Sequence, residues 1–278
     1  MTYSNAPVPK NANISDDNRG FRHLMLLLLM VVGLFGVGIF SLFKLASWGA
    51  GFVPFKYETM LAQQVATLPF SASNSKADPD VIAAQSYLQE LANTAARAQN
   101  LPADMPITVH LVLDDTVNGF ATLGGHVILH QGLLERLPSE NALMMLLGHE
   151  IGHVYHRHPI RSVSGAVVGG LFVEFITGGS GWGAALIGEQ ASRLLINGFS
   201  RDQERQSDAY GAEVLQRVYG HTTGARQLFE VLQAEEGNFG PRFEMLSTHP
   251  NTKARAKGFQ QATQHPLTAL KVDFSDLK

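Results

Sequence analysis

The stretch Pro138–Pro159, PSENALMMLLGHEIGHVYHRHP, decides how the rest of this 278-residue sequence is interpreted. It opens with Ser139, a residue type that often caps helix N-termini, and no helix breaker follows until Pro159. The sequence therefore predicts a helix over residues 140–155, with the pattern His149–His153, HEIGH, in its interior.

Two histidines four residues apart on a helix lie on one face, so His149 and His153 can bind the same divalent metal ion. Glu150 lies between them and is placed to act as a general base for water. Apolar residues cover most of this helix, namely Leu143, Met144, Leu146, Leu147, Ile151 and Val154. Buried imidazoles need polar partners. We therefore expect a metal site, with hydrogen-bonded core histidines as the alternative.

A third ligand must come from elsewhere in the chain. The extended motif HExxHxxGxxH requires glycine and histidine at positions that His156 and Pro159 occupy here. A second predicted helix begins after Ser200 and carries Glu204 and Asp208 on one face. We expect Glu204 to bind the metal and Asp208 to accept a hydrogen bond from a metal-binding imidazole.

The same two carboxylates also fit a solvated helix face paired with Arg201 and Arg205, which is the alternative. Glu174 and Glu189 are weaker candidates for the third ligand. Small residues favour the metal site, because they let the two helices approach closely enough for ligands from both to meet. These residues are Gly148 and Gly152 on the first helix and Ala209, Gly211 and Ala212 on the second.

A short sheet is predicted upstream of the metal helix. Apolar residues alternate over 107–113, and two more strand-like segments, 118–123 and 125–129, meet at Gly124-Gly125. This pattern favours a small antiparallel sheet with a hairpin turn at the two glycines.

Five segments, taken in order, resemble a known family, the membrane-associated zinc metallopeptidases that include HtpX, BepA and the CAAX prenyl endopeptidase. The segments are Asn118–Thr122, Gly124-Gly125, His149–His153 with His158, Glu204 with Asp208, and Ser247–Pro250 with Arg255. One departure is Gly119, where the family commonly has alanine. The resemblance implies a zincin-like domain, one Zn2+ ion per chain, and hydrolysis of peptide bonds in protein quality control.

The resemblance also places His249 and Arg255 near the metal, where either would stabilise the oxyanion formed during hydrolysis. His249 would alternatively close over the metal in a resting state, or simply begin a helix before Pro250.

In zincins of this general plan, the edge strand beside the metal helix pairs with the substrate backbone. We therefore predict that substrate binds along this strand, with an ordinary hairpin as the alternative. The residues concerned are Asn118, Gly119, Phe120 and Ala121.

An apolar segment near the N-terminus predicts a membrane span. Leu24–Phe43 contains 20 successive residues without a charge, about 30 Å as a helix, which matches the hydrocarbon core of a bilayer. A cleavable signal peptide is the alternative, but no convincing cleavage site follows. Three basic residues precede the span and two follow it closely, which favours an N-terminus inside the cell. In a bacterium this predicts a single-pass inner-membrane protein with a periplasmic catalytic domain.

The fold class predicted for the whole chain is α+β and mostly helical. The expected parts are a disordered tail over 1–22, a transmembrane helix over 23–45 and a metallopeptidase domain over 46–278, which includes helices at about 57–68 and 80–99.

The apolar, glycine-rich segment 163–187 has two interpretations. It forms helices packed on the domain or at the membrane surface, or it enters the bilayer. We favour the first, because each half is too short for a full crossing and Glu174 is costly in lipid.

Composition narrows the partners and the function classes. The formal net charge of −3 offers no basic surface for nucleic acid, and the absence of cysteine excludes disulfides and thiol ligands. We expect protein or peptide substrates, including misfolded membrane-associated proteins, and a lipid bilayer as partners. The alternatives are an inactive adaptor that binds extended chains, against which the intact Glu150 argues, and a prenyl-protein endopeptidase, whose many spans are missing.

Overall fold

The computed structural model describes residues 19–65, 78–179, 181, 198–238, 249, 252–259 and 265–277. The chain forms two compact units, Met1–Lys44 and Leu45–Lys278. The predicted disordered tail lies mostly outside the described residues, but its last four residues belong to helix α1, which spans Arg19–Ala50.

Helix α1 begins earlier and ends later than the predicted span of 23–45. Within the described part of the chain, it is the one helix long and apolar enough to cross a membrane. Its apolar side chains, such as Leu26, Leu34 and Phe35, are exposed in the protein.

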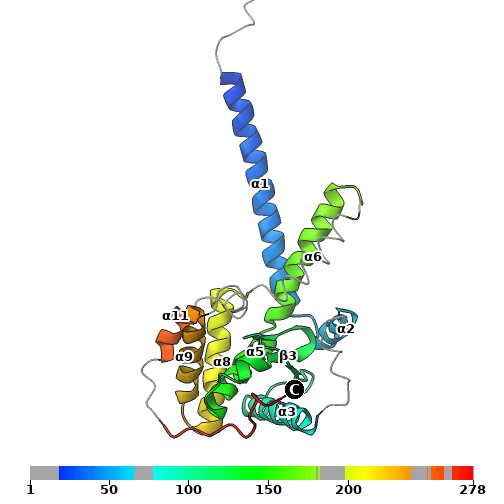
Figure 1. Ribbon diagram of the computed structural model, residues 1–278. Coiled ribbons are helices and arrows are strands. Elements are labelled where there is room, and N and C mark those ends of the chain that lie inside the picture. Colours follow the sequence, from blue (N-terminus) through cyan, green and yellow to red (C-terminus); the bar gives the residue numbers. More distant parts are fainter. Residues whose placement is uncertain are drawn as a thin grey trace, which may run out of the picture. The chain divides into compact units, whose positions relative to one another are not determined.

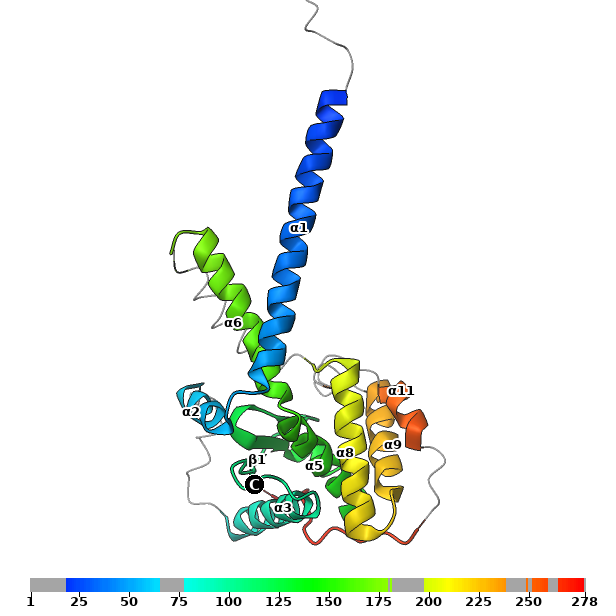
Figure 2. The same ribbon diagram turned by 180° about the vertical axis from the view of Figure 1, so that it is seen from behind.

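The remaining elements form the second unit, shown from two sides in Figures 1 and 2. The helices and 3-10 turns are α2 (Phe55–Val65), α3 (Pro79–Ala98), η2 (Leu123–Gly125), α4 (Gln131–Leu134), α5 (Glu140–Tyr155), α6 (His158–Ile176), α8 (Arg201–Tyr219), α9 (Thr223–Asn238), α11 (Thr252–Ala256) and η3 (Lys257–Phe259). The strands are β1 (Thr108–Val112), β2 (Gly119–Ala121) and β3 (His126–His130). The two predicted helices before the sheet are confirmed as α2 and α3, and the α+β fold class is confirmed.

The sheet is mixed, which corrects the antiparallel sheet predicted from the sequence. Its strand order is β1-β3-β2, with β1 parallel to β3 and β2 antiparallel to β3. The hairpin at Gly124-Gly125 puts β3 next to β2, and β3 then fills the centre, where it meets β1 in the parallel direction. Alternation along a strand indicates which side chains share a face but not which way the neighbouring strand runs.

Helix α5 is the centre of the domain, and its boundaries match the prediction. The Ser139 hydroxyl caps it by accepting a hydrogen bond from the Ala142 amide at 3.1 Å. Every residue from Glu140 to Val154 is buried. Helix α3 and β2 pack against α5, as do α8 and α9, and both views show α8 beside α5. Helix α5 therefore carries its motif in the core rather than at the surface.

The close approach of α5 and α8 predicted from small residues is confirmed. A Cβ atom on Gly148 would lie 2.9 Å from the Cα of Gly211, and one on Gly152 would lie 3.0 Å from the Cα of Ser207. Side chains at these positions would force the helices apart. Helix α8 starts at a capping box formed by Ser200 and Gln203, which fixes where its first turn faces α5.

The first half of the segment 163–187 is helical, since α6 continues to Ile176. Phe175 and Ile176 at its end are exposed. Residue 180 and residues 182–197 lie outside the described part of the chain, so the second half of the expected hairpin stays a prediction.

Candidate metal centre

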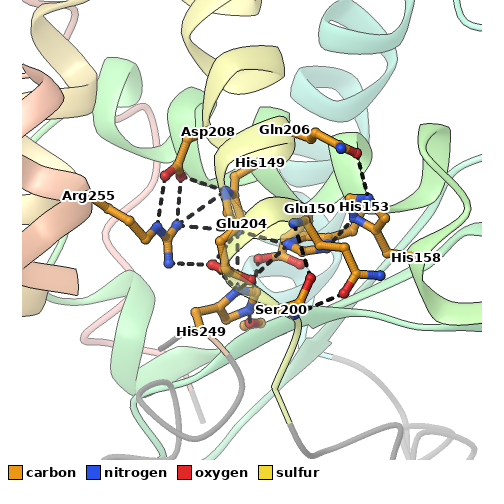
Figure 3. A network of polar contacts seen from close by, with 12 residues as sticks. His149, Glu150, His153, His158, Ser200, Glu204, Gln206, Asp208, His249 and Arg255 are labelled. Atoms are coloured by element: carbon orange, nitrogen blue, oxygen red, sulfur yellow. Dashed lines mark hydrogen bonds and ion pairs between the residues drawn. The ribbon is translucent and has the colours of Figure 1, made fainter. Parts of the chain in front are cut away.

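Four buried side chains meet between α5, α8 and the segment that contains His249 (Figure 3). One ligand-type atom from each of His149, His153, Glu204 and His249 lies within 4.8 Å of the other three. The Nε2 atoms of His149 and His153 are 3.0 Å apart, and Glu204 oxygens lie 3.7 and 3.4 Å from them, respectively. The three residues predicted as metal ligands are thus brought together.

The far side of each imidazole fixes its tautomer. His149 Nδ1 lies 3.0 Å from a carboxylate oxygen of Asp208, as predicted, and because a carboxylate only accepts, this contact directs Nδ1–H toward Asp208 and leaves Nε2 to face the cluster. Burial lowers the pKa of His158 to about 3, so this ring is neutral. Its Nε2 lies 3.1 Å from Gln206 Oε1 and its Nδ1 lies 2.9 Å from His153 Nδ1. His158 therefore donates to Gln206 and accepts from His153.

This arrangement fits a divalent cation. His149 Nε2, His153 Nε2 and the Glu204 carboxylate converge from two helices, close enough together for one ion to contact all three. Two imidazole nitrogens and one carboxylate are a ligand set that zinc takes in hydrolytic enzymes. Burial, followed by the neighbouring His149 and His249, lowers the pKa of His153, which keeps it a neutral ligand.

The structure excludes the alternative of a solvated face on α8. Glu204 and Asp208 are buried, while Arg205 pairs with the exposed Asp202 instead. Glu174, one of the weaker candidates, accepts a hydrogen bond from the Gly181 amide and is not in the cluster. Glu189 lies outside the described residues.

Glu150 is fully buried beside the cluster, and neither of its carboxylate oxygens has a well-formed hydrogen bond within the described part of the chain. Burial raises its pKa, although His249, His149 and the amide of Ala121 pull it down. A carboxylate kept in this state holds a proton more readily than one in water, which suits a group that takes up and returns protons.

His249 lies among the proposed ligands rather than beyond them. Its Nδ1 is 3.1 Å from His149 Nε2 and 3.2 Å from a Glu204 oxygen, and its Nε2 is 3.2 Å from the carbonyl oxygen of Gly119. Burial lowers the pKa of His249, but the nearby carboxylates of Glu204 and Glu150 together raise it by more, so the pKa of His249 is raised overall. The prediction that His249 lies near the proposed ligands is thus met in position, while its role, whether oxyanion donor, closure over the metal or helix start, stays a prediction. Ser247, Thr248 and Pro250 lie outside the described residues.

Arg255 is held by carboxylates. Its Nε and Nη2 donate to the two oxygens of Asp208 at 2.8 and 2.6 Å, and Nη1 contacts Glu204. Despite burial, the positive groups around Glu204 and Asp208 lower the pKa of both carboxyls. This geometry lets Arg255 orient Asp208 and Glu204, and its expected role as an oxyanion donor stays a prediction.

The predicted substrate strand is an edge strand next to α5. Within the hairpin, the amide of His130 bonds to the Asn118 carbonyl and Phe120 pairs with Ile128, so the backbone groups of Gly119 and Ala121 face away from β3. Those outward groups point at the site, since the Gly119 carbonyl contacts His249 and the Ala121 amide lies near Glu150.

Sequence reasoning gave His158 no role, and it missed Gln206 altogether. His158 was visible only as a residue that follows the HExxH pattern in the family. Gln206 lies two residues after Glu204 on α8, so its side chain leaves the helix in another direction, and only the fold shows that it reaches His158.

A buried HExxH helix, packed on a second helix that carries Glu204 and Asp208 and flanked by an edge strand, defines the zincin-like class of metallopeptidases. The chain belongs to peptidase family M48, which matches residues 83–263.

The chain is also similar in sequence to several proteins that are named as proteases. The chain is 27% identical over 164 residues to the mitochondrial metalloendopeptidase OMA1 of Schizosaccharomyces pombe, covering 57% of this chain and 47% of that protein. It is 30% identical over 162 residues to the beta-barrel assembly-enhancing protease of Escherichia coli, covering 54% and 33%. It is 26% identical over 175 residues to metalloprotease YcaL of the same species, covering 62% and 68%. The match spans less than half the length of the first two.

Proposed function

We propose that this chain is a membrane-anchored zinc endopeptidase that hydrolyses peptide bonds in protein substrates. The observation that carries the proposal is the convergence of His149, His153 and Glu204 in the core with Glu150 beside them. Two relatives are named metalloendopeptidase or protease, and the family is one of peptidases.

In this proposal His149, His153 and Glu204 hold one Zn2+ ion, with Asp208 and His158 fixing the two imidazoles from behind. When bound, the ion supplies Lewis acidity, which lowers the pKa of water and polarises a carbonyl. Glu150 takes the proton from the attacking water and passes it to the leaving amine, as its raised pKa allows. Arg255 keeps Asp208 and Glu204 charged and oriented during both transfers.

We propose that the substrate adds to the sheet along β2. The outward carbonyl of Gly119 and amide of Ala121 offer main-chain hydrogen bonds to an extended peptide, which recognises backbone rather than sequence. Phe120 lies between Gly119 and Ala121 on this strand, and Asn118 comes directly before the strand. Such recognition suits a role in protein quality control, where substrates share an unfolded backbone.

The structure supports a resting form in which His249 takes the place of substrate. Its imidazole contacts His149, Glu204 and the outward Gly119 carbonyl together. A substrate paired with β2 needs that carbonyl, so His249 must leave before a peptide binds. This makes the enzyme latent as long as His249 keeps these contacts.

We propose that α1 anchors the protein in the bacterial inner membrane with a single crossing. The length and exposed apolar surface of α1 support this, and the basic residues before it favour a cytoplasmic N-terminus and a periplasmic domain. Several relatives are bacterial.

The test uses the full chain purified in detergent with zinc and an unfolded casein-type substrate. We expect the wild type to bind one zinc per chain and to cut the substrate more slowly than His249→Ala, because His249 must leave before a peptide binds. Glu150→Gln should keep zinc and lose cleavage, and Glu204→Ala should lose both. Zinc binding without cleavage, even after His249→Ala, would favour the adaptor role over the enzyme.

A further inference from the structure

The residue that joins α5 to α6 has an unusual backbone. Arg157 lies in the left-handed region, with φ of 61° and ψ of 31°, although its side chain is large and buried. In the described part of the chain, only Asn100 and Arg157 combine a positive φ with a side chain. Asparagine tolerates this conformation, whereas arginine adopts it only where its surroundings impose it.

A carboxylate from α2 holds Arg157 in place. Glu58 is fully buried, and its Oε2 lies 2.9 Å from both Nε and Nη2 of Arg157. The ring of Phe55, one turn earlier on α2, lies 5.1 Å from the centre of the guanidinium. Two buried charges contribute little net stability compared with apolar residues of the same size, so packing alone gives no reason for this pair.

The other oxygen of Glu58 reaches the hairpin that contains the proposed substrate strand. It accepts a hydrogen bond from the amide of Gly124 at 3.2 Å. Gly124 has a φ of 75°, and a Cβ atom there would lie 2.9 Å from the Cβ of Ala62. Helix α2 therefore lies directly against the turn between β2 and β3, and both views show it beside this end of the sheet.

Arg157 directly precedes His158, so its conformation sets the direction in which the His158 ring leaves the chain. That ring accepts the hydrogen bond from His153 Nδ1 at 2.9 Å and donates to Gln206, as Figure 3 shows. The contacts thus run from Glu58 through Arg157 and His158 to the metal-facing imidazole of His153.

A small apolar cluster fixes α2 in the same place independently of the ion pair. It joins the end of α1, helix α2, the turn η2 and the start of α6. Its members are Ala50, Ala62, Leu123, Ile160 and Val163. Because this cluster already packs α2 against the domain, the Glu58 carboxylate is not needed to hold α2 in place, and its contacts serve to orient Arg157 and the Gly124 turn.

We infer that Glu58 is a positioning residue of the metal centre, acting through Arg157 and His158 on His153. This inference rests on the proposed metallopeptidase function and adds α2, the first helix after the membrane anchor, to the machinery of the site. The segment between anchor and domain is thereby a structural part of the enzyme rather than a linker.

The experiment compares Glu58→Gln with Glu140→Gln in the full chain in detergent. Glutamine at position 58 keeps an acceptor for the Gly124 amide but places no charge on Arg157. Glu140 is the matched control, a buried carboxylate that accepts two hydrogen bonds at the other end of α5. Zinc affinity is measured by competition with a chelator, and kcat and KM are measured with casein at saturating zinc.

We expect Glu58→Gln to weaken zinc binding by about 10- to 100-fold, the usual cost of disturbing the residues behind a metal ligand. KM should change little, because the Gly124 end of the contact survives. Glu140→Gln should lower the melting temperature and leave zinc affinity within about twofold of the wild type. Equal zinc affinities for Glu58→Gln and the wild type would overturn the inference, as would equal losses in both variants.

A second pair of variants separates positioning from backbone strain. Arg157→Gly relieves the left-handed conformation but removes the partner of Glu58, and Asn100→Gly makes the same backbone change at a residue outside the metal cluster. Weaker zinc binding in Arg157→Gly alone supports the inference, and unchanged binding contradicts it. Zinc binding without cleavage in both the wild type and His249→Ala overturns the proposed function, while the affinity ratios still decide the role of Glu58.

Discussion

Helix α5 carries two buried glutamates, and their surroundings differ. Glu140, in the first turn, accepts hydrogen bonds from the hydroxyls of Tyr87 and Tyr219, both at 2.8 Å. Glu150, ten residues later, is also buried but has no well-formed hydrogen bond in the part of the chain that the structure describes. Two hydroxyl groups at 2.8 Å satisfy the Glu140 carboxylate, whereas Glu150 has only looser contacts, such as His249 Nε2 at 3.4 Å from its Oε1.

The difference shows how one helix serves two purposes. A buried carboxylate with two donors stabilises the fold, and it also lies where the helix dipole favours negative charge. A buried carboxylate with only weak contacts to its neighbours costs stability, and proteins retain such groups where chemistry needs them. The comparison therefore predicts opposite outcomes when each glutamate is replaced by glutamine.

The largest effect is expected for Glu150→Gln. Cleavage of casein should fall by a factor of about 100 to 10,000, because the general base is lost. The free energy of unfolding of the metal-free protein should change by no more than about 1 kcal/mol, because a neutral amide costs less to bury but loses the attraction of His249, whose Nε2 lies 3.4 Å from Glu150 Oε1. Activity assays and chemical unfolding in the presence of a chelator measure the two quantities.

Asp208→Asn is expected to weaken zinc binding by about 10- to 100-fold while the free energy of unfolding changes less. The amide cannot supply the negative charge that holds the proton on His149 Nδ1, and it leaves part of the Arg255 guanidinium without its ion pair. Chelator competition measures the affinity. Asp202→Asn on the exposed first turn of α8 is the control and should change nothing.

Local patterns were enough to predict the two helices that carry the site. Ser139 and Ser200 cap α5 and α8 as expected, and the small residues between the helices bring Glu204 and Asp208 to the histidines. Helix caps and helical periodicity depend on residues close in sequence, so the sequence alone was enough to predict them.

The contacts that depend on distant residues were not predictable. Glu58 and Arg157 are 99 positions apart, and neither belongs to a pattern that indicates a buried pair. The parallel pairing of β1 with β3 was likewise hidden, because it depends on which strand fills the centre of the sheet.

Glu140→Gln tests the other half of the comparison and should have a smaller effect. Removing the charge weakens the hydrogen bonds from Tyr87 and Tyr219, which should lower the free energy of unfolding by about 1–3 kcal/mol. Cleavage and zinc affinity should match the wild type. If activity fell in proportion to that of Glu150→Gln, the two carboxylates would not be separable into structural and catalytic roles.

The smallest effect is expected at a pair of histidines in the sheet, away from both glutamates. His110 Nε2 lies 2.9 Å from His126 Nδ1, and burial, with the neighbouring ring for His110, lowers the pKa of both. The folded protein therefore binds fewer protons here than the unfolded chain, whose histidines titrate near 6.5. The stability that the pair contributes is present above about pH 6.5 and is lost as the pH falls through the lower folded-state values. Chemical unfolding of the metal-free protein between pH 8 and pH 5 measures this loss, and the double variant His110→Gln/His126→Gln should show a shallower decline. If the free energy of unfolding of the double variant fell as steeply as that of the wild type, the acid sensitivity would come from the histidines of the metal centre and not from the pair in the sheet.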